Sequence, residues 1–157
     1  MKSIFVDCGL GISGDMLASA FFDLGVPYSL YMDNLVSLKI NKKYDLKFRE
    51  ANSNGIKGIL CEKIKMEIEF KEVTRSLKEI KKIIFDSSLN DVVKKKAIKV
   101  FELLAKSEAV VHGLKISDVH FHELGSTDSI IDIVNACSAI DFLKPDRIYF
   151  SNPPSGK

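Results

Sequence analysis

The side chains best suited to chemistry lie in one short stretch, which reads His-Phe-His-Glu-Leu-Gly-Ser-Thr-Asp-Ser-Ile-Ile-Asp from residue 120 to residue 132. Five of its side chains are of types that bind metals: His120, His122, Glu123, Asp128 and Asp132. In an extended segment, side chains two residues apart point the same way, so both imidazoles could reach one ion. The set predicts a metal or catalytic site. Its spacing matches neither a zinc finger nor HExxH, so it does not name the metal.

The acids of this stretch offer more than metal binding. Glu123 could supply an oxygen ligand or act as a base. Asp128 and Asp132 are four apart on an expected helix, where like charges repel by roughly 0.2–0.5 kcal/mol unless a cation or base lies between them. His112 adds a third imidazole after the preceding helix. Simpler explanations remain open, because a loop histidine often only forms a hydrogen bond and an aspartate suits a helix start.

A glycine-rich turn near the N-terminus is the second candidate site. The segment from residue 9 to residue 14 is literally GxGxxG, lying between an expected strand and an expected helix. The dinucleotide-binding motif requires a second strand after the helix, whereas a second helix follows here, so we do not adopt that interpretation. The turn can still offer backbone N–H groups to a phosphate through Gly11, Ser13 and Gly14.

Two acids flank this turn. Asp7 and Asp15 could hold a cation or act as catalytic acid–base groups. The alternative is a tight turn that needs small residues, with Asp15 only favouring the N-terminus of its helix. Cys8 could be a thiolate ligand or nucleophile, although a free cysteine is more often part of the core.

Hydrophobic periodicity predicts the elements that must position these residues. We expect a strand over 3–7, helices over 14–24 and 27–38, and a β-hairpin formed by 44–50 and 59–70. Helices should follow over 73–84, from a cap at residues 87–88 to Gly113, and over 126–143, before a strand over 147–151. The segment 117–125 is interpreted as too short and too polar for a core element. The fold class is therefore α/β or α+β, a single domain with helices packed against a small mixed sheet that includes the hairpin.

Composition excludes several classes of protein. The chain has 157 residues, of which 46% are hydrophobic and 28% charged, as in ordinary soluble globular proteins. No stretch approaches the ~18 apolar residues of a membrane span, so no membrane partner is expected. The first acid comes too early for a signal peptide. Three cysteines without a CxxC pair predict reduced thiols and a cytoplasmic location.

Charge is unevenly distributed along the chain. Residues 1–38, 39–106 and 107–157 carry net charges of −3, +8 and −3. The basic middle could face an anionic partner such as a nucleotide or an acidic protein. Its bases are mostly lysines with few aromatics among them, whereas nucleic-acid readout depends more on arginine and stacking rings. We interpret it as a solvated surface and expect no nucleic-acid partner.

Several motifs together resemble one known family. They are Asp7-Cys8, the segment 11–16, the segment 54–58, Val111-His112-Gly113, the segment 119–123 with Gly125, Asp128-Ser129, and Asp132-Ile133. In this order and over nearly the whole chain, they are similar to the N-terminal part of the LarC nickel insertion proteins, which mature the nickel-pincer cofactor of lactate racemase.

The resemblance implies an activity and roles for residues. Family members are CTP-dependent nickel chelatases, classed as lyases, which insert nickel into pyridinium-3,5-bisthiocarboxylic acid mononucleotide. The implied roles are nickel handling by the His-Phe-His-Glu segment, removal of a ring proton by Glu123 or an aspartate, and phosphate binding by the turn at 11–14.

Departures from the family pattern shape further expectations. The C-terminal region that the family associates with CTP and a divalent cation is absent from this sequence, as is a histidine-rich stretch after the hairpin. We expect the chain to be incomplete alone, to work with a separate C-terminal polypeptide, and to form a homo-oligomer around an unpaired last strand. The alternatives are a non-catalytic metal or phospho-ligand binding module and a metal-dependent hydrolase. We also expect both candidate sites to lie on the same side of the fold.

Overall fold

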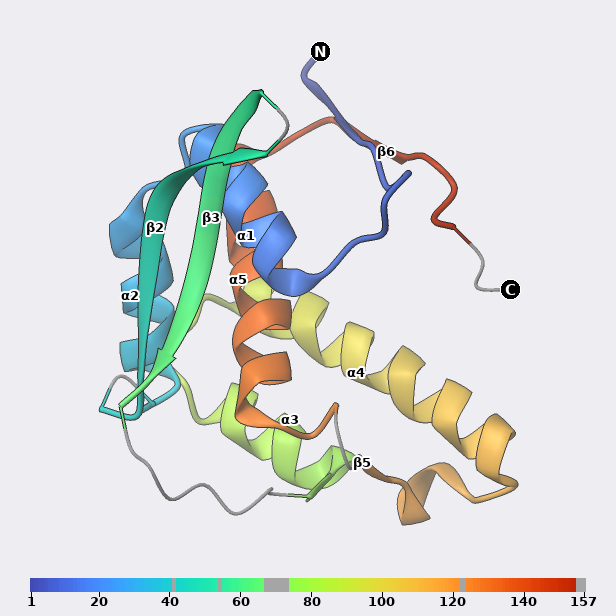
Figure 1. Cartoon of the computed structure of the whole chain (residues 1–157). Coiled ribbons are helices and arrows are strands. Elements are labelled where there is room, and N and C mark those ends of the chain that lie inside the picture. Colours follow the sequence, from blue (N-terminus) through green and yellow to red (C-terminus); the bar gives the residue numbers. More distant parts are fainter. Residues whose placement is uncertain (41, 54, 67–73, 122–123, 155–157) are drawn as a thin grey trace.

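The computed structural model describes residues 1–40, 42–53, 55–66, 74–121 and 124–154 (Figure 1). In chain order the elements are β1 (Ser3–Val6), α1 (Gly14–Asp23), α2 (Tyr28–Ser37), β2 (Tyr44–Ser53), β3 (Ile56–Lys65), β4 (Arg75–Ser76), α3 (Leu77–Phe85), α4 (Asp91–His112), the 3-10 turn η1 (Ile116–Asp118), β5 (His120–Phe121), α5 (Thr127–Leu143) and β6 (Arg147–Phe150). The expected mixed α/β class is confirmed. No helix in these described ranges is long and apolar enough to cross a membrane.

Helix ends follow local chemistry, with two changes from expectation. Gly113 ends α4 in the left-handed conformation, as predicted. Its start is Asn90 rather than the expected serines, because the Asn90 side chain accepts a hydrogen bond from Val93 N–H at 2.8 Å. Ser76 forms a capping box with Glu79, so α3 begins at Leu77 and residues expected to be helical form β4 instead.

Helix α5 is the centre of the molecule (Figure 1). One core cluster lies between α3, α4 and α5 and includes Ile80, Phe101 and Val134. A second cluster joins α1, α2, β2 and β3 to α5, with Tyr31 and Leu35 completely buried. Because both cores use α5, its residues are held firmly along most of its length.

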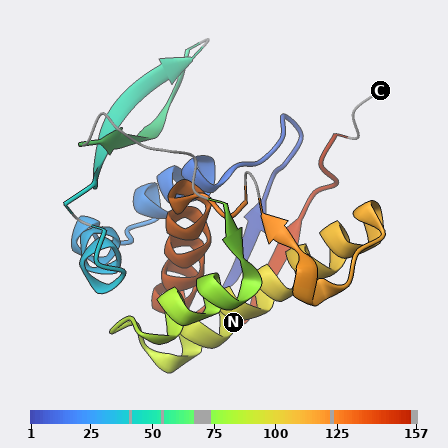
Figure 2. The same ribbon diagram turned by 90° about the horizontal axis from the view of Figure 1, so that it is seen from below.

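The described strands form three two-stranded sheets rather than one mixed sheet. β2 and β3 make the expected antiparallel hairpin. β1 and β6 pair in parallel, from Ser3 opposite Arg147 to Val6 opposite Phe150, so the last strand is paired and that expectation was wrong. Figure 2 shows this pair side by side. The expected extension of the hairpin to residue 70 and the helix start at 73 lie outside the described residues.

The segment 117–125 contributes to the core, contrary to expectation. Val119 and Phe121 are buried in the cluster beneath α4, and the Phe121 ring lies 6.2 Å from that of Phe101, edge to face. β5 pairs with β4, which places Ser76 opposite His120. Two inward side chains around one outward histidine form an alternation too short to recognise in sequence.

Candidate functional site

The glycine turn meets one acid of the other predicted site, Asp132, where the first turn of α1 lies on α5. A Cβ atom added to Gly14 would overlap the side chain of Asp132, so only glycine fits at this position. The close approach explains why the turn needs a small residue. It also brings the first turn of α1 against α5, two helices that lie next to each other in Figure 1.

Asp132 is a largely buried carboxylate held by a lysine from the hairpin. Lys63 Nζ donates to both carboxylate oxygens at 2.7 Å, and the two side chains are 17% and 24% exposed. Burial raises the pKa of Asp132, and the hydrogen bonds and charge of Lys63 offset this only in part. Asp132 therefore binds a proton more readily than an ordinary aspartate.

A second lysine of the same strand faces the other acid of α5. Lys65 Nζ lies 3.7 Å from Asp128 Oδ2. Each of the two acids, Asp128 and Asp132, therefore has one lysine of β3 beside it, which offsets the repulsion between them. Asp128 Oδ1 is buried and has no hydrogen-bond partner among the described residues. Burial, followed by hydrogen bonding to Asp128 and its charge, raises the pKa of Tyr44 to about 12.

Asp15 has the opposite electrostatic character to Asp132. Its Oδ1 accepts a short hydrogen bond from Ser13 Oγ, which is the main reason that its pKa is lowered. The charge of Lys63 acts in the same direction, whereas burial opposes both. The cluster thus contains one acid that stays ionised and another whose proton affinity is increased, a pairing typical of acid–base sites.

Ser13 occupies the N-cap position of α1 but does not cap the helix with its side chain. Its hydroxyl is committed to Asp15 instead. The amide groups of the first turn therefore receive no side-chain cap from it. Such amides, together with the helix dipole, favour an anion.

Asp7 has a structural environment of its own. Its carboxylate accepts hydrogen bonds from Gly9 N–H at 3.0 Å and Ser151 Oγ at 2.9 Å, and these lower its pKa. Ser151 Oγ also accepts from Cys8 N–H at 2.6 Å, so the turn after β1 is tied to the segment after β6. Cys8 is buried as a free thiol. Gly11 has φ +96° and donates its N–H to the Cys8 carbonyl.

The predicted metal ligands are described only in part. His120 lies exposed on β5, whereas His122 and Glu123 lie outside the described residues. His112 is on the last turn of α4, with its Nε2 atom 3.1 Å from Glu108 Oε2. Within the described ranges, no three or more histidine, cysteine, aspartate or glutamate side chains are grouped so as to hold a metal ion.

Sequence reasoning missed the basic side chains of this site. Lys63 and Lys65 follow Cys61 at two-residue intervals on β3 and so share its face of the strand, and only that period could have drawn attention to them. Arg75 was also missed. It donates to Gly125 O at 2.5 Å and Thr127 Oγ1 at 3.2 Å, which fixes the chain at the start of α5.

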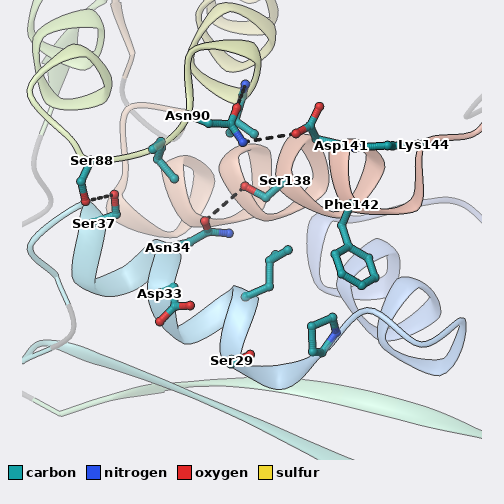
Figure 3. A pocket seen from close by; sticks show the side chains of 14 residues that line it. Ser29, Asp33, Asn34, Ser37, Ser88, Asn90, Ser138, Asp141, Phe142 and Lys144 are labelled. Carbon is teal, nitrogen blue, oxygen red and sulfur yellow. Dashed lines mark hydrogen bonds between the residues drawn. The ribbon is translucent and has the colours of Figure 1, made fainter.

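A cavity of about 710 Å³ lies elsewhere, between α2, α5 and the connection from α3 to α4 (Figure 3). It contains none of the predicted residues. Buried amides join its walls: Asn34 donates to Asn135 at 2.9 Å and accepts from Ser138 at 3.2 Å. We interpret this network as a polar link between the two helices, because each bond is internal to the protein.

Comparison with known proteins gives a consistent result. Residues 4–157 match the family described as nickel insertion protein. Proteins named pyridinium-3,5-bisthiocarboxylic acid mononucleotide nickel insertion protein are 40% identical in Clostridium kluyveri, 37% in Clostridium acetobutylicum and 38% in Staphylococcus saprophyticus. These matches cover 96%, 99% and 99% of the chain but 40%, 44% and 39% of the relatives. No solved structure matches. The chain spans about two fifths of the length of these relatives, and it belongs to the nickel insertion protein family.

Proposed function

We propose that this chain takes part in inserting nickel into pyridinium-3,5-bisthiocarboxylic acid mononucleotide, which yields a nickel-pincer nucleotide. The observation that carries the proposal is identity of 37–40% over almost the whole chain to proteins named for this reaction. Nickel is then a substrate of the protein, and the nucleotide is its small-molecule partner.

The reaction requires a base. Nickel replaces the hydrogen of a ring carbon, so that carbon must release its proton while the metal–carbon bond forms. We assign proton transfer to the cluster that contains Asp15 and Asp132. Support comes from their opposite pKa directions, because a carboxylate with a raised pKa is the better proton acceptor near neutral pH. Asp7 and Glu123 remain proposals from sequence, and the hydrogen bonds that lower the pKa of Asp7 argue for a structural role.

Nickel itself is assigned to imidazole ligands. We propose His120, with His122 and Glu123, because imidazole suits nickel. Asp128 and Asp132 were also predicted as ligands. Their lysine neighbours argue against this role, since an ammonium group and a divalent cation compete for the same carboxylate oxygens.

The phosphate of the nucleotide is assigned to the turn formed by Gly11, Ser13 and Gly14. Asp15 Oδ1 accepts from Met16 N–H at 3.0 Å, so the support comes from the amides before Met16 and from the helix dipole, which favour an anion at the start of α1. The adjacent Lys63 and Lys65 add positive charge at the same end of the site. A phosphate here would set the ring of the nucleotide near Asp15 and Asp132.

We further propose that the chain does not complete the reaction alone. CTP and its divalent cation are assigned to the part of the relatives that this chain does not match. A cytoplasmic location is supported by three free, buried cysteines. Self-association is also proposed, and light scattering would test it against the chain mass of 17.5 kDa.

The testing experiment is a mass measurement of the nucleotide. The purified chain is incubated with nickel, CTP, magnesium and the bisthiocarboxylate nucleotide, with and without the polypeptide that corresponds to the unmatched part of the Clostridium kluyveri relative. We expect the metallated product only when both polypeptides are present. Product formation by the chain alone would contradict the assignment of CTP. Hydrolysis of a generic phosphoester without nickel insertion would favour the metal-dependent hydrolase instead.

A further inference from the structure

A cavity of about 550 Å³ lies between the end of α4, η1 and β5. Its lining includes His112 and His120, two of the three histidines in the chain, together with Glu108. These residues come from two neighbouring elements, α4 and β5, which are joined by the short segment that contains η1. None of the phosphate-binding or proton-transfer residues proposed above lines this cavity.

The α4 wall places one imidazole beside a carboxylate. Glu108 and His112 are one turn apart on the helix, and Glu108 Oε2 lies 3.1 Å from His112 Nε2. When the carboxylate accepts a hydrogen bond from Nε2–H of the neutral ring, the lone pair is on Nδ1. A carboxylate beside one ring nitrogen is a usual way in which proteins orient a histidine so that the other nitrogen can bind a metal.

The opposite wall holds the second imidazole on an anchored strand. His120 is flanked by the buried side chains of Val119 and Phe121, and its backbone is paired opposite Ser76. Both neighbours point into the core, so the histidine of this strand projects to the other side. Two histidines on rigid elements therefore line one cavity.

We propose that this cavity binds a nickel ion through His112 Nδ1 and His120, with Glu108 as the residue that positions His112. The inference rests on the proposed function and deepens it, since it identifies where the metal substrate is received. Nickel prefers nitrogen ligands and accepts water in its other positions. No three protein ligands converge among the described residues, and the volume leaves space for those waters. An ion bound mainly by water and two imidazoles is held loosely enough to be passed on.

Calorimetric titration of the whole chain with nickel chloride tests the site. We expect His112→Ala and His120→Ala each to weaken binding at least tenfold. The double variant should bind no more weakly than the weaker single variant, because both side chains hold the same ion. Glu102→Ala is the matched control on α4, where Glu102 pairs with Lys81 outside the cavity, and it should bind as the unmodified chain does.

Glu108 tests the positioning role separately. Glu108→Ala should weaken nickel binding roughly 10- to 100-fold, the usual effect of removing a carboxylate behind a metal-bound histidine. Glu108→Gln keeps an oxygen that can accept from His112 and should restore most of the affinity and the nickel absorption spectrum. Equal melting temperatures of all variants would exclude a loss of folding as the cause.

Two results would overturn the inference. If nickel affinity is unchanged in His112→Ala but reduced in His120→Ala, the ion is bound by β5 and the segment that follows it, and α4 takes no part. Equal affinity in the double variant and the unmodified chain would exclude the cavity altogether. Nickel insertion measured in parallel, with the second polypeptide present, keeps the two proposals apart, because full product formation by His112→Ala would refute the cavity site and leave the proposed function standing.

Discussion

At the scale of single residues, the candidate site depends on Asp132 and the lysine that holds it. Taking a carboxylate out of water raises its pKa, and two hydrogen bonds from Lys63 lower it again. The first effect is the larger, so the pKa of Asp132 stays above its usual value. Removing Lys63 would leave the burial cost without its compensation.

Lys63→Met is therefore expected to destabilise the protein by roughly 2–4 kcal/mol at pH 7, as urea unfolding would measure. This loss of stability in Lys63→Met should become smaller as the pH falls. Asp132 in the folded variant has a pKa above that of the unfolded chain, so the folded state gains its proton first and is favoured at lower pH.

The matched control for this change is Lys81→Met, which breaks an exposed ion pair with Glu102 and should change the free energy of unfolding by less than about 1 kcal/mol. A stability of Lys63→Met that does not depend on pH between 4 and 7 would show that Asp132 keeps its ordinary pKa in the fold.

Gly14 makes the second prediction at this scale. Gly14→Ala should destabilise the protein by about 1–3 kcal/mol, because the new methyl group overlaps Asp132 and must push α1 away from α5. Gly58→Ala is the control, since no atom lies within 4 Å of its added Cβ. Equal melting temperatures of the two variants would refute the close contact.

At the scale of elements, the short strand β5 is more important than its length suggests. Phe121 fills the core beneath α4, and the backbone next to it carries His120. Phe121→Ala should cost roughly 3–5 kcal/mol in the free energy of unfolding, because it leaves a cavity. Phe85→Ala, at a side chain 73% exposed, should cost less than about 0.5 kcal/mol. A loss of less than about 1 kcal/mol in the free energy of unfolding of Phe121→Ala would show that this segment is a surface loop and not part of the core.

The helices and the β2–β3 hairpin could be predicted from sequence, but the pairing of the other strands could not. Apolar residues repeat every three to four positions in each helix, so one segment carries its own signal. The β1–β6 pair joins residues 3–6 to 147–150, and no local pattern names a strand's distant partner. The two-residue strands β4 and β5 are shorter than any detectable alternation.

The candidate site, like the fold, could be predicted only where its residues lie close together in sequence. The acids of α5 and the glycine turn were visible because their residue types cluster along the chain. Lys63 and Lys65 were not, because each reaches its aspartate from a hairpin more than sixty residues away in sequence. The contact of Gly14 with Asp132 likewise exists only after α1 has packed on α5.

At the scale of the whole molecule, α5 contributes side chains to both core clusters. The same helix also carries Asp128 and Asp132. Its N-terminal half meets α1 and the hairpin lysines, and its N-terminus is fixed by Arg75 next to β5. The acid cluster therefore lies on this helix, and the cavity proposed to bind nickel lies beside the strand before it.

The most direct measurement uses a chimera. Residues 1–157 of this chain replace the matched stretch of the Clostridium kluyveri relative, and the mass of the bisthiocarboxylate nucleotide is followed after addition of nickel and CTP. We predict that the chimera forms the metallated nucleotide and that its Asp132→Asn variant forms it at least tenfold more slowly. A folded chimera that binds nickel and nucleotide but yields no metallated product, while the relative itself does, would contradict the proposed function.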